Sequence, residues 1–85
     1  MKFEYNTSGT CSKKIEIELS DDGVVESVKF LGGCHGNLQG IAALARGMKA
    51  EDVIEKISGI RCGFKNTSCP DQLSKALKLA LSAEK

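Results

Sequence analysis

The chain has 85 residues and a net charge of +1, with acidic and basic residues interspersed along it. That balance argues against a general nucleic-acid-binding protein, which carries a basic stripe, and no apolar run is long enough to cross a bilayer. A single domain over residues 1–85 is expected, and its core is expected to be aliphatic because tryptophan is absent and aromatic residues make up only 5% of the chain.

Four cysteines are the most informative residues of the sequence: Cys11, Cys34, Cys62 and Cys69. The N-terminal residues 1–5 contain no apolar segment of the kind that directs secretion, so a cytoplasmic location is expected. Stable disulfides are rare in the cytosol, and an intracellular chain with this many cysteines more often binds metal or does redox work.

The first part of the chain predicts two strands. A short strand is expected where Phe3 and Tyr5 alternate with polar residues, and a turn is expected over residues 6–10. In the segment that follows, three apolar residues alternate with charged ones: Ile15, Ile17 and Leu19. This period of two indicates a strand with one face buried.

A hairpin is predicted next. Residues 20–23, Ser-Asp-Asp-Gly, form a turn of the Asp-Gly type, which is typical of tight hairpins. The returning strand is expected over residues 24–31, with Val28 and Phe30 facing inward. Together these segments predict an antiparallel sheet with one face in water.

The rest of the chain predicts three helices. The first is expected to end near Gly47 and has an apolar stripe at helical spacing: Leu38, Ile41, Ala42 and Ala45. A shorter helix is expected from about Ala50 to Gly59, followed by a loop over residues 60–68. The last helix is expected to begin at Pro70, and it has the clearest stripe: Leu73, Ala76, Leu77, Ala80 and Leu81.

The predicted fold class is therefore α+β, a three-stranded antiparallel sheet followed by three helices packed on one face. The cysteines fall at or beside the ends of these elements. Cys34 and Cys69 each precede the apolar stripe of a helix by four residues, and the partial positive charge at a helix N-terminus favours a thiolate. The pattern predicts a metal site where the sheet edge and the helix starts converge. The alternative is that the thiols pack as small apolar residues.

Residues 67–71, Thr-Ser-Cys-Pro-Asp, contain the signature that names the TSCPD domain family. The resemblance covers essentially the whole chain and includes the loop Gly-Gly-Cys-His-Gly-Asn at residues 32–37. It implies a small stand-alone relative of a domain that is appended to adenosylcobalamin-dependent ribonucleotide reductases. An accessory role in ribonucleotide reduction, with a reductase as partner, is therefore an alternative function. A chain of this length cannot hold the catalytic barrel of a reductase, so any ribonucleoside-diphosphate reductase activity would be inherited from the family.

The order of elements also resembles the U-type (IscU/NifU-like) iron–sulfur cluster scaffolds. In that family a first cysteine precedes a β-hairpin, a second lies in a Gly-Cys-Gly loop that opens a helix, and a third opens a late helix. Cys11, Cys34 and Cys69 stand at the matching positions. The resemblance implies the same sheet-and-helix fold and a cluster held by these three residues.

The chain departs from the scaffold pattern at three places. Lys13 stands where scaffolds have an aspartate, Ser68 stands where they have a histidine, and residues 64–67 replace the segment read by their chaperone partner. The aspartate helps to make a scaffold's cluster labile, so these departures count against transient cluster assembly and favour a site that holds its metal.

The predicted ligands are Cys11, Cys34 and Cys69, with Cys62 as the fourth and His35 as the alternative fourth. A closed set of four cysteines suits zinc or a held iron–sulfur cluster, and the sequence does not distinguish the two. If Cys62 turns away, an open three-thiolate site remains, and an exchange or scaffold-like role is expected instead.

Further residues are expected around these ligands. His35 neighbours Cys34 as a proton carrier or surface residue, and Asp71 supports the start of the last helix. Lys13 and Arg61 are expected to be solvated, with a positive charge near the thiolates as the alternative role of either residue. An iron–sulfur protein is a further expected partner, and the oligomeric state is left open. A structural module with non-ligating cysteines is the third possibility. Catalysis by the chain alone is not expected, because no catalytic triad, carboxylate pair or phosphate loop can be assembled from the sequence.

Overall fold

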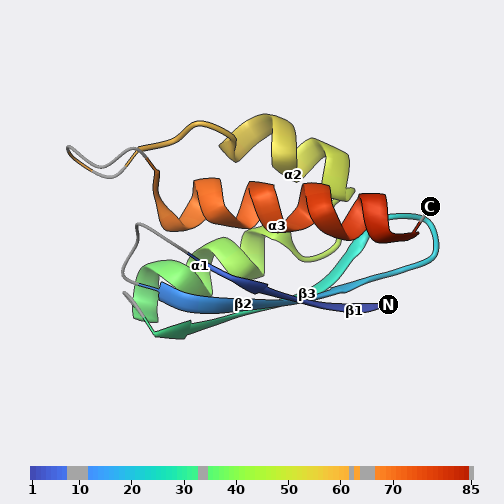
Figure 1. Ribbon diagram of the computed structural model, residues 1–85, viewed down its shortest axis with the longest axis horizontal. Coiled ribbons are helices and arrows are strands. Elements are labelled where there is room, and N and C mark those ends of the chain that lie inside the picture. Colours follow the sequence, from blue (N-terminus) through green and yellow to red (C-terminus); the bar gives the residue numbers. More distant parts are fainter. Residues whose placement is uncertain (8–11, 33–34, 62, 64–66, 85) are drawn as a thin grey trace.

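The computed structural model describes residues 1–7, 12–32, 35–61, 63 and 67–84. Within this part of the chain, three strands form one antiparallel sheet in the order β1-β2-β3: β1 (Lys2–Asn6), β2 (Ser12–Leu19) and β3 (Val25–Gly32). Three helices follow: α1 (His35–Ala45), α2 (Ala50–Ile57) and α3 (Cys69–Glu84). Figure 1 shows all of them on the same side of the sheet. The predicted α+β class is confirmed.

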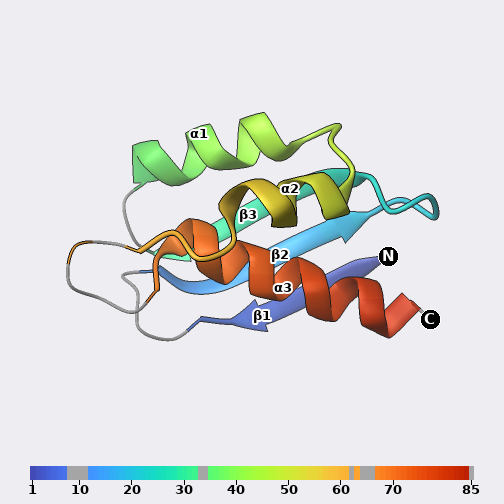
Figure 2. The same ribbon diagram turned by 90° about the horizontal axis from the view of Figure 1, so that it is seen from above.

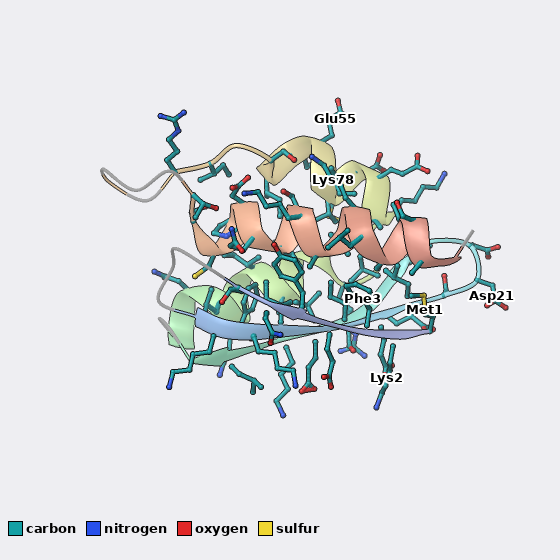
Figure 3. The ribbon with its side chains drawn as sticks, in the orientation of Figure 1. Met1, Lys2, Phe3, Asp21, Glu55 and Lys78 are labelled. Carbon is teal, nitrogen blue, oxygen red and sulfur yellow. The ribbon has the colours of Figure 1, made fainter. Side chains whose placement is uncertain are left out.

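The sheet has one face toward the helices and one toward water, as the alternation predicts. Phe3 pairs with Ile17 and Tyr5 with Ile15, so apolar side chains meet across the strands on one face. Ile15 and Ile17 are almost completely buried. Figure 3 shows Phe3 on the helix side of β1, whereas Lys2 points away from the helices.

Charged residues cover the other face of the sheet. Lys14 Nζ lies 2.8 Å from Glu4 Oε1, and Lys2 Nζ lies 3.6 Å from Glu18 Oε1. Surface pairs of this kind contribute little to stability, because water and salt screen them. The stability of the sheet therefore comes mainly from the helix side, where the core residues are buried.

The hairpin between β2 and β3 forms as predicted, but β3 departs from simple alternation. Gly23 has a φ of +79°, a backbone conformation that favours glycine, and its N–H donates to the Ser20 carbonyl. Leu19 pairs with Val25, while Glu18 pairs with Ser27, which leaves one extra residue on β3. This bulge turns Val25 into the core, where it is fully buried, although period two counted from Val28 would place it outside.

Each helix covers a different part of the structure (Figure 2). The contacts join α3 to β1 and β2, α1 to β3, and α2 to α3. Leu73, Ala76, Leu77 and Ala80 of α3 are fully buried, so the predicted stripe is the centre of the core. Gly47, with a φ of +89°, follows α1 as predicted. None of the helices in the described ranges is long and apolar enough to cross a membrane.

Candidate functional site

The described neighbours of the cysteines gather at one end of the molecule. In both ribbon views β1 ends, β2 begins, β3 ends, and α1 and α3 begin at the end opposite the two chain termini (Figures 1 and 2). The strand register agrees, because Asn6 pairs with Lys14 and Ser12 pairs with Gly32. Cys11, Cys34, Cys62 and the side chain of His35 lie outside the described residues, so their expected roles as ligands stay predictions.

Cys69 is the predicted ligand that the structure describes. It is the first residue of α3 and is 8% exposed. The helix therefore begins one residue earlier than predicted, with Pro70 in second place. The cause is Ser68, whose Oγ accepts the Asp71 N–H at 3.1 Å and so caps the helix. Cys69 thus belongs to the first turn, where the partial positive charge of the helix is greatest.

A buried polar network surrounds this first turn. Asp71 is 6% exposed, and its Oδ1 accepts the Gly59 N–H at 2.7 Å. Its other oxygen, Oδ2, accepts a hydrogen bond from the Thr67 hydroxyl. Lys75, one turn further along α3, has its Nζ 3.6 Å from the same Oδ2. One carboxylate therefore joins the end of α2, the segment before α3 and the helix itself.

Ser68 and Gln72 complete the network. The Ser68 hydroxyl donates to the Ile60 carbonyl at 2.6 Å, and Gln72 Nε2 donates to Thr67 Oγ1 at 2.9 Å. We refer to the residues joined in this way as the neck: Gly59, Ile60, Thr67, Ser68, Asp71 and Gln72. Across the described residues, no buried side-chain nitrogen or oxygen lacks a hydrogen-bond partner, so the neck is satisfied without a ligand.

The neck fixes the charge state of Asp71. The Thr67 hydroxyl, then the Gly59 N–H, hold the pKa of this carboxyl below its ordinary value, and Lys75 adds a smaller effect in the same direction. The two oxygens are thereby occupied as acceptors inside the chain. Asp71 is a structural carboxylate beside the predicted site, and its oxygens are not offered to a metal.

One sequence pattern indicates part of the neck, namely the cap at the start of α3. Ser68 and Asp71 stand in the Ser-x-x-Asp spacing of a capping box. In a capping box the acidic side chain bonds back to the capping residue's N–H, whereas Asp71 bonds Gly59 and Thr67. The spacing thus identifies the cap and the acid, but not the partners that the acid takes.

The remaining described features add no ligand. Lys13, expected near the thiolates, is exposed on β2, and Arg61 is exposed as well. The described residues contain no group of three or more His, Cys, Asp or Glu side chains that could hold a metal ion. The predicted site therefore depends on the three cysteines that lie outside the description.

Two surface hollows lie away from the neck. One, of about 210 Å³, lies between β3 and α1, and its lining includes Phe30 and Leu38. The other, of about 510 Å³, opens on the charged outer face of the sheet and is lined by residues such as Glu16 and Lys29. Cys69 lines neither hollow. The first hollow is smaller than most small-molecule sites, and the second is lined mainly by charged residues of the outer face.

Comparison with known proteins identifies a family. The family model of the TSCPD domain matches residues 2–81 of the chain. Neither the curated proteins nor the solved structures gave a match. The likeness to U-type iron–sulfur scaffolds is therefore not supported by these comparisons and rests on the order of elements alone.

Proposed function

The chain belongs to the TSCPD domain family, and from this premise we propose that it binds zinc or an iron–sulfur cluster through its cysteines. The proposed ligands are Cys11, Cys34 and Cys69, with Cys62 as the fourth and His35 as its alternative. Sulfur ligands suit both groups, because zinc and iron–sulfur clusters prefer soft thiolates.

One observation carries the proposal, which is the convergence of element ends. Cys11 directly precedes β2 and Cys34 directly precedes α1, while Cys69 opens α3. These three element starts lie at the same end of the molecule (Figures 1 and 2). Because consecutive Cα atoms are about 3.8 Å apart, the adjacency of Cys11 and Cys34 in sequence to these element starts supports a shared site.

The chain's own part in such a site is to hold thiolates near one another and to exclude water. Cys69 is supplied by a buried, capped helix turn, and its neighbour Asp71 is committed to the neck. A bound metal would supply cross-linking between the ends of the sheet and the helices, which stabilises a small domain.

Metal analysis of protein purified without air tests the proposal. We expect about one equivalent of zinc, or the visible absorption of an iron–sulfur cluster, and replacement of Cys11, Cys34 or Cys69 by serine should abolish binding. The matched control is Val53→Ala, which loosens the core of α2 without touching a cysteine and should leave binding intact. Folded wild-type protein that takes up neither zinc nor iron would contradict the proposal.

A second candidate function is redox cycling of Cys62 and Cys69 in an accessory role to ribonucleotide reduction. The observation in its favour is the neck, which holds Ile60 and Ser68 within hydrogen-bond distance, two residues and one residue before these cysteines. Oxidation would form one sulfur–sulfur bond and pass two electrons and two protons to a disulfide oxidant such as oxidised glutathione. A thiol titration in glutathione buffers tests this, and the absence of a reversible two-electron step near cytosolic potentials would refute it.

A further inference from the structure

We propose that the edge of β3 beside α1 binds an extended peptide segment of a partner protein, which adds to the sheet as a fourth antiparallel strand. The segment has the pattern apolar–acidic–apolar. This site goes beyond the proposed function and does not depend on it, because every residue that forms it lies on β3, on α1 or between α1 and α2.

The hydrogen bonds of the sheet leave Val28 and Phe30 facing outward. The Met1 nitrogen donates to the Leu19 carbonyl at 2.8 Å, and the Leu19 N–H donates to the Met1 carbonyl at 2.9 Å. Alternate residues of β2, counted back from Leu19, therefore direct their N–H and C=O groups toward β1. Ile17 is one of them, and Val28 lies opposite it, with Phe30 two residues further along β3. Val28 and Phe30 thus direct their own N–H and C=O groups away from β2.

The chain itself occupies the first part of this edge. The Val25 N–H donates to the Met48 carbonyl and the Gly47 N–H donates to the Val25 carbonyl, both at 2.8 Å. Val24 and Lys49 form an antiparallel bridge. The segment between α1 and α2 therefore stands in the position of a fourth strand at the start of β3. A peptide beside the rest of β3 would continue that strand in the same direction.

The rest of the edge offers both hydrogen bonds and apolar surface. Within the described ranges, no hydrogen bond from another element uses the outward N–H and C=O groups of Val28 and Phe30. Such groups are a template for pairing with another chain. Beside them lies the hollow of about 210 Å³, whose lining includes Phe30 of β3 and Leu38 and Ala42 of α1. The backbone groups would bind the peptide's main chain, and the hollow would receive its apolar side chains.

The charges along the edge set the chemistry of the peptide. Lys29 is the middle residue of the open part of β3, and its side chain is exposed on the outer face of the sheet. Arg46 and Lys49 are exposed where the fourth-strand segment begins, whereas Glu26 is the acidic residue of β3. Because cations outnumber acids here, an acidic side chain opposite Lys29 is favoured.

A second copy of the chain fits this edge poorly. α1 contacts β3 and lies alongside it at the edge of the sheet (Figure 2). Pairing of two β3 strands about a two-fold axis would bring two α1 helices over the same pair of strands. In the register that pairs Val28 with Phe30, two Lys29 side chains would also stand directly opposite each other, which is destabilising. A single extended segment carries neither penalty.

The test is a titration of the full isotope-labelled chain with the synthetic peptide acetyl-Thr-Val-Glu-Val-Thr-amide, followed by NMR and amide hydrogen exchange. We expect the amide signals of Val28 and Phe30 to shift. At a peptide concentration of about ten times the dissociation constant, their exchange should slow by about tenfold. Methylation of both valine nitrogens of the peptide should abolish this protection, because it removes the donors. A lysine in place of the peptide's glutamate should weaken binding by about threefold or more.

A charge reversal in the chain tests the position of the acidic residue. Lys29→Glu should reverse the preference, so that the lysine peptide binds more tightly than the glutamate peptide. The matched control is Lys2→Glu, which makes the same change of charge on the opposite edge strand and should keep the wild-type preference. A preference that Lys29→Glu leaves unchanged would overturn the proposed pattern of the peptide.

Three results would overturn the site itself. One is the absence of binding at millimolar peptide, and another is binding that leaves the Val28 and Phe30 amides unshifted or that survives methylation of the peptide. The third is protection of both amides without peptide in a chain that sediments as a dimer, which would assign the edge to a second copy.

Discussion

Replacement of Asp71 by asparagine isolates the charge of the buried carboxylate. A hydrogen bond to a charged group contributes about 1.5–3 kcal/mol and a neutral one about 0.5–1.5 kcal/mol. Asparagine keeps an acceptor for the Gly59 N–H but turns an amide toward Thr67, whose hydroxyl then loses its acceptor. The Lys75 contact, half exposed, adds a few tenths of a kcal/mol at most. We expect the free energy of unfolding to fall by about 2–3 kcal/mol in total, which corresponds to a fall in Tm of about 10–20 °C for a domain of this size.

The assay is thermal unfolding followed by circular dichroism, with reductant and chelator present so that metal does not contribute. Glu55→Gln is the matched control, because it removes the same charge from an exposed position on α2 that points away from the body of the protein (Figure 3). The free energy of unfolding of this control should stay within about 0.5 kcal/mol of the wild-type value. A loss for Asp71→Asn no larger than that of the control would refute the reasoning.

The pH dependence supplies an independent check. The Thr67 hydroxyl and the Gly59 N–H lower the pKa of Asp71 in the folded state. The carboxylate therefore makes its full contribution to the free energy of unfolding above the pKa that it has in the unfolded chain, about 4. This contribution is lost as the pH falls through the lower pKa of the folded state. The difference in stability between wild type and Asp71→Asn should narrow as the pH falls from about 4 toward 2. A difference that stays constant over that range contradicts the assignment.

Three further substitutions test the core and the backbone. Leu77→Ala, at a fully buried position of α3, should lower the free energy of unfolding by about 2–5 kcal/mol in urea, and a loss below about 1 kcal/mol would place Leu77 outside the core. Gly40→Ala should raise the free energy of unfolding by about 0.5–1 kcal/mol, because an added Cβ meets no atom within 4 Å and α1 gains helix propensity. A lower Tm would show that the face of α1 around Gly40 is covered. Gly23→Ala should cost about 1–2 kcal/mol in the same assay because its φ is +79°, and an unchanged Tm would mean that the turn rearranges.

Much of the fold was predictable from local patterns. Alternation placed Ile15, Ile17 and Leu19 on the buried face, and the Asp-Gly pair placed the hairpin turn. These predictions succeeded because burial of one face imposes a fixed period on a strand or a helix. Val25 is the exception, since the bulge that turns it inward comes from pairing with β2, which no local pattern on β3 reveals.

The candidate site was predictable in part. The apolar stripe and Pro70 predicted that the last helix begins beside Cys69. The helix begins one residue earlier than predicted, at Cys69 itself, because Ser68 caps it. Asp71 was expected to support the helix, and its bonds to Gly59 and Thr67 extend that role to the neighbouring segment. Those partners lie 12 and four positions away, so only the folded chain brings the first of them into reach.

The sequence by itself determined the elements, the buried faces and the family, because periodicity, turn residues and the Thr-Ser-Cys-Pro-Asp segment are all local properties of the chain. The tertiary structure decided which ends of those elements lie together and which polar side chains form the hydrogen bonds between them. Asp71 shows the difference. Its place in a helix start follows from spacing, but its low pKa and its role as a bridge arise from burial and from donors on separate segments, which exist together only after folding.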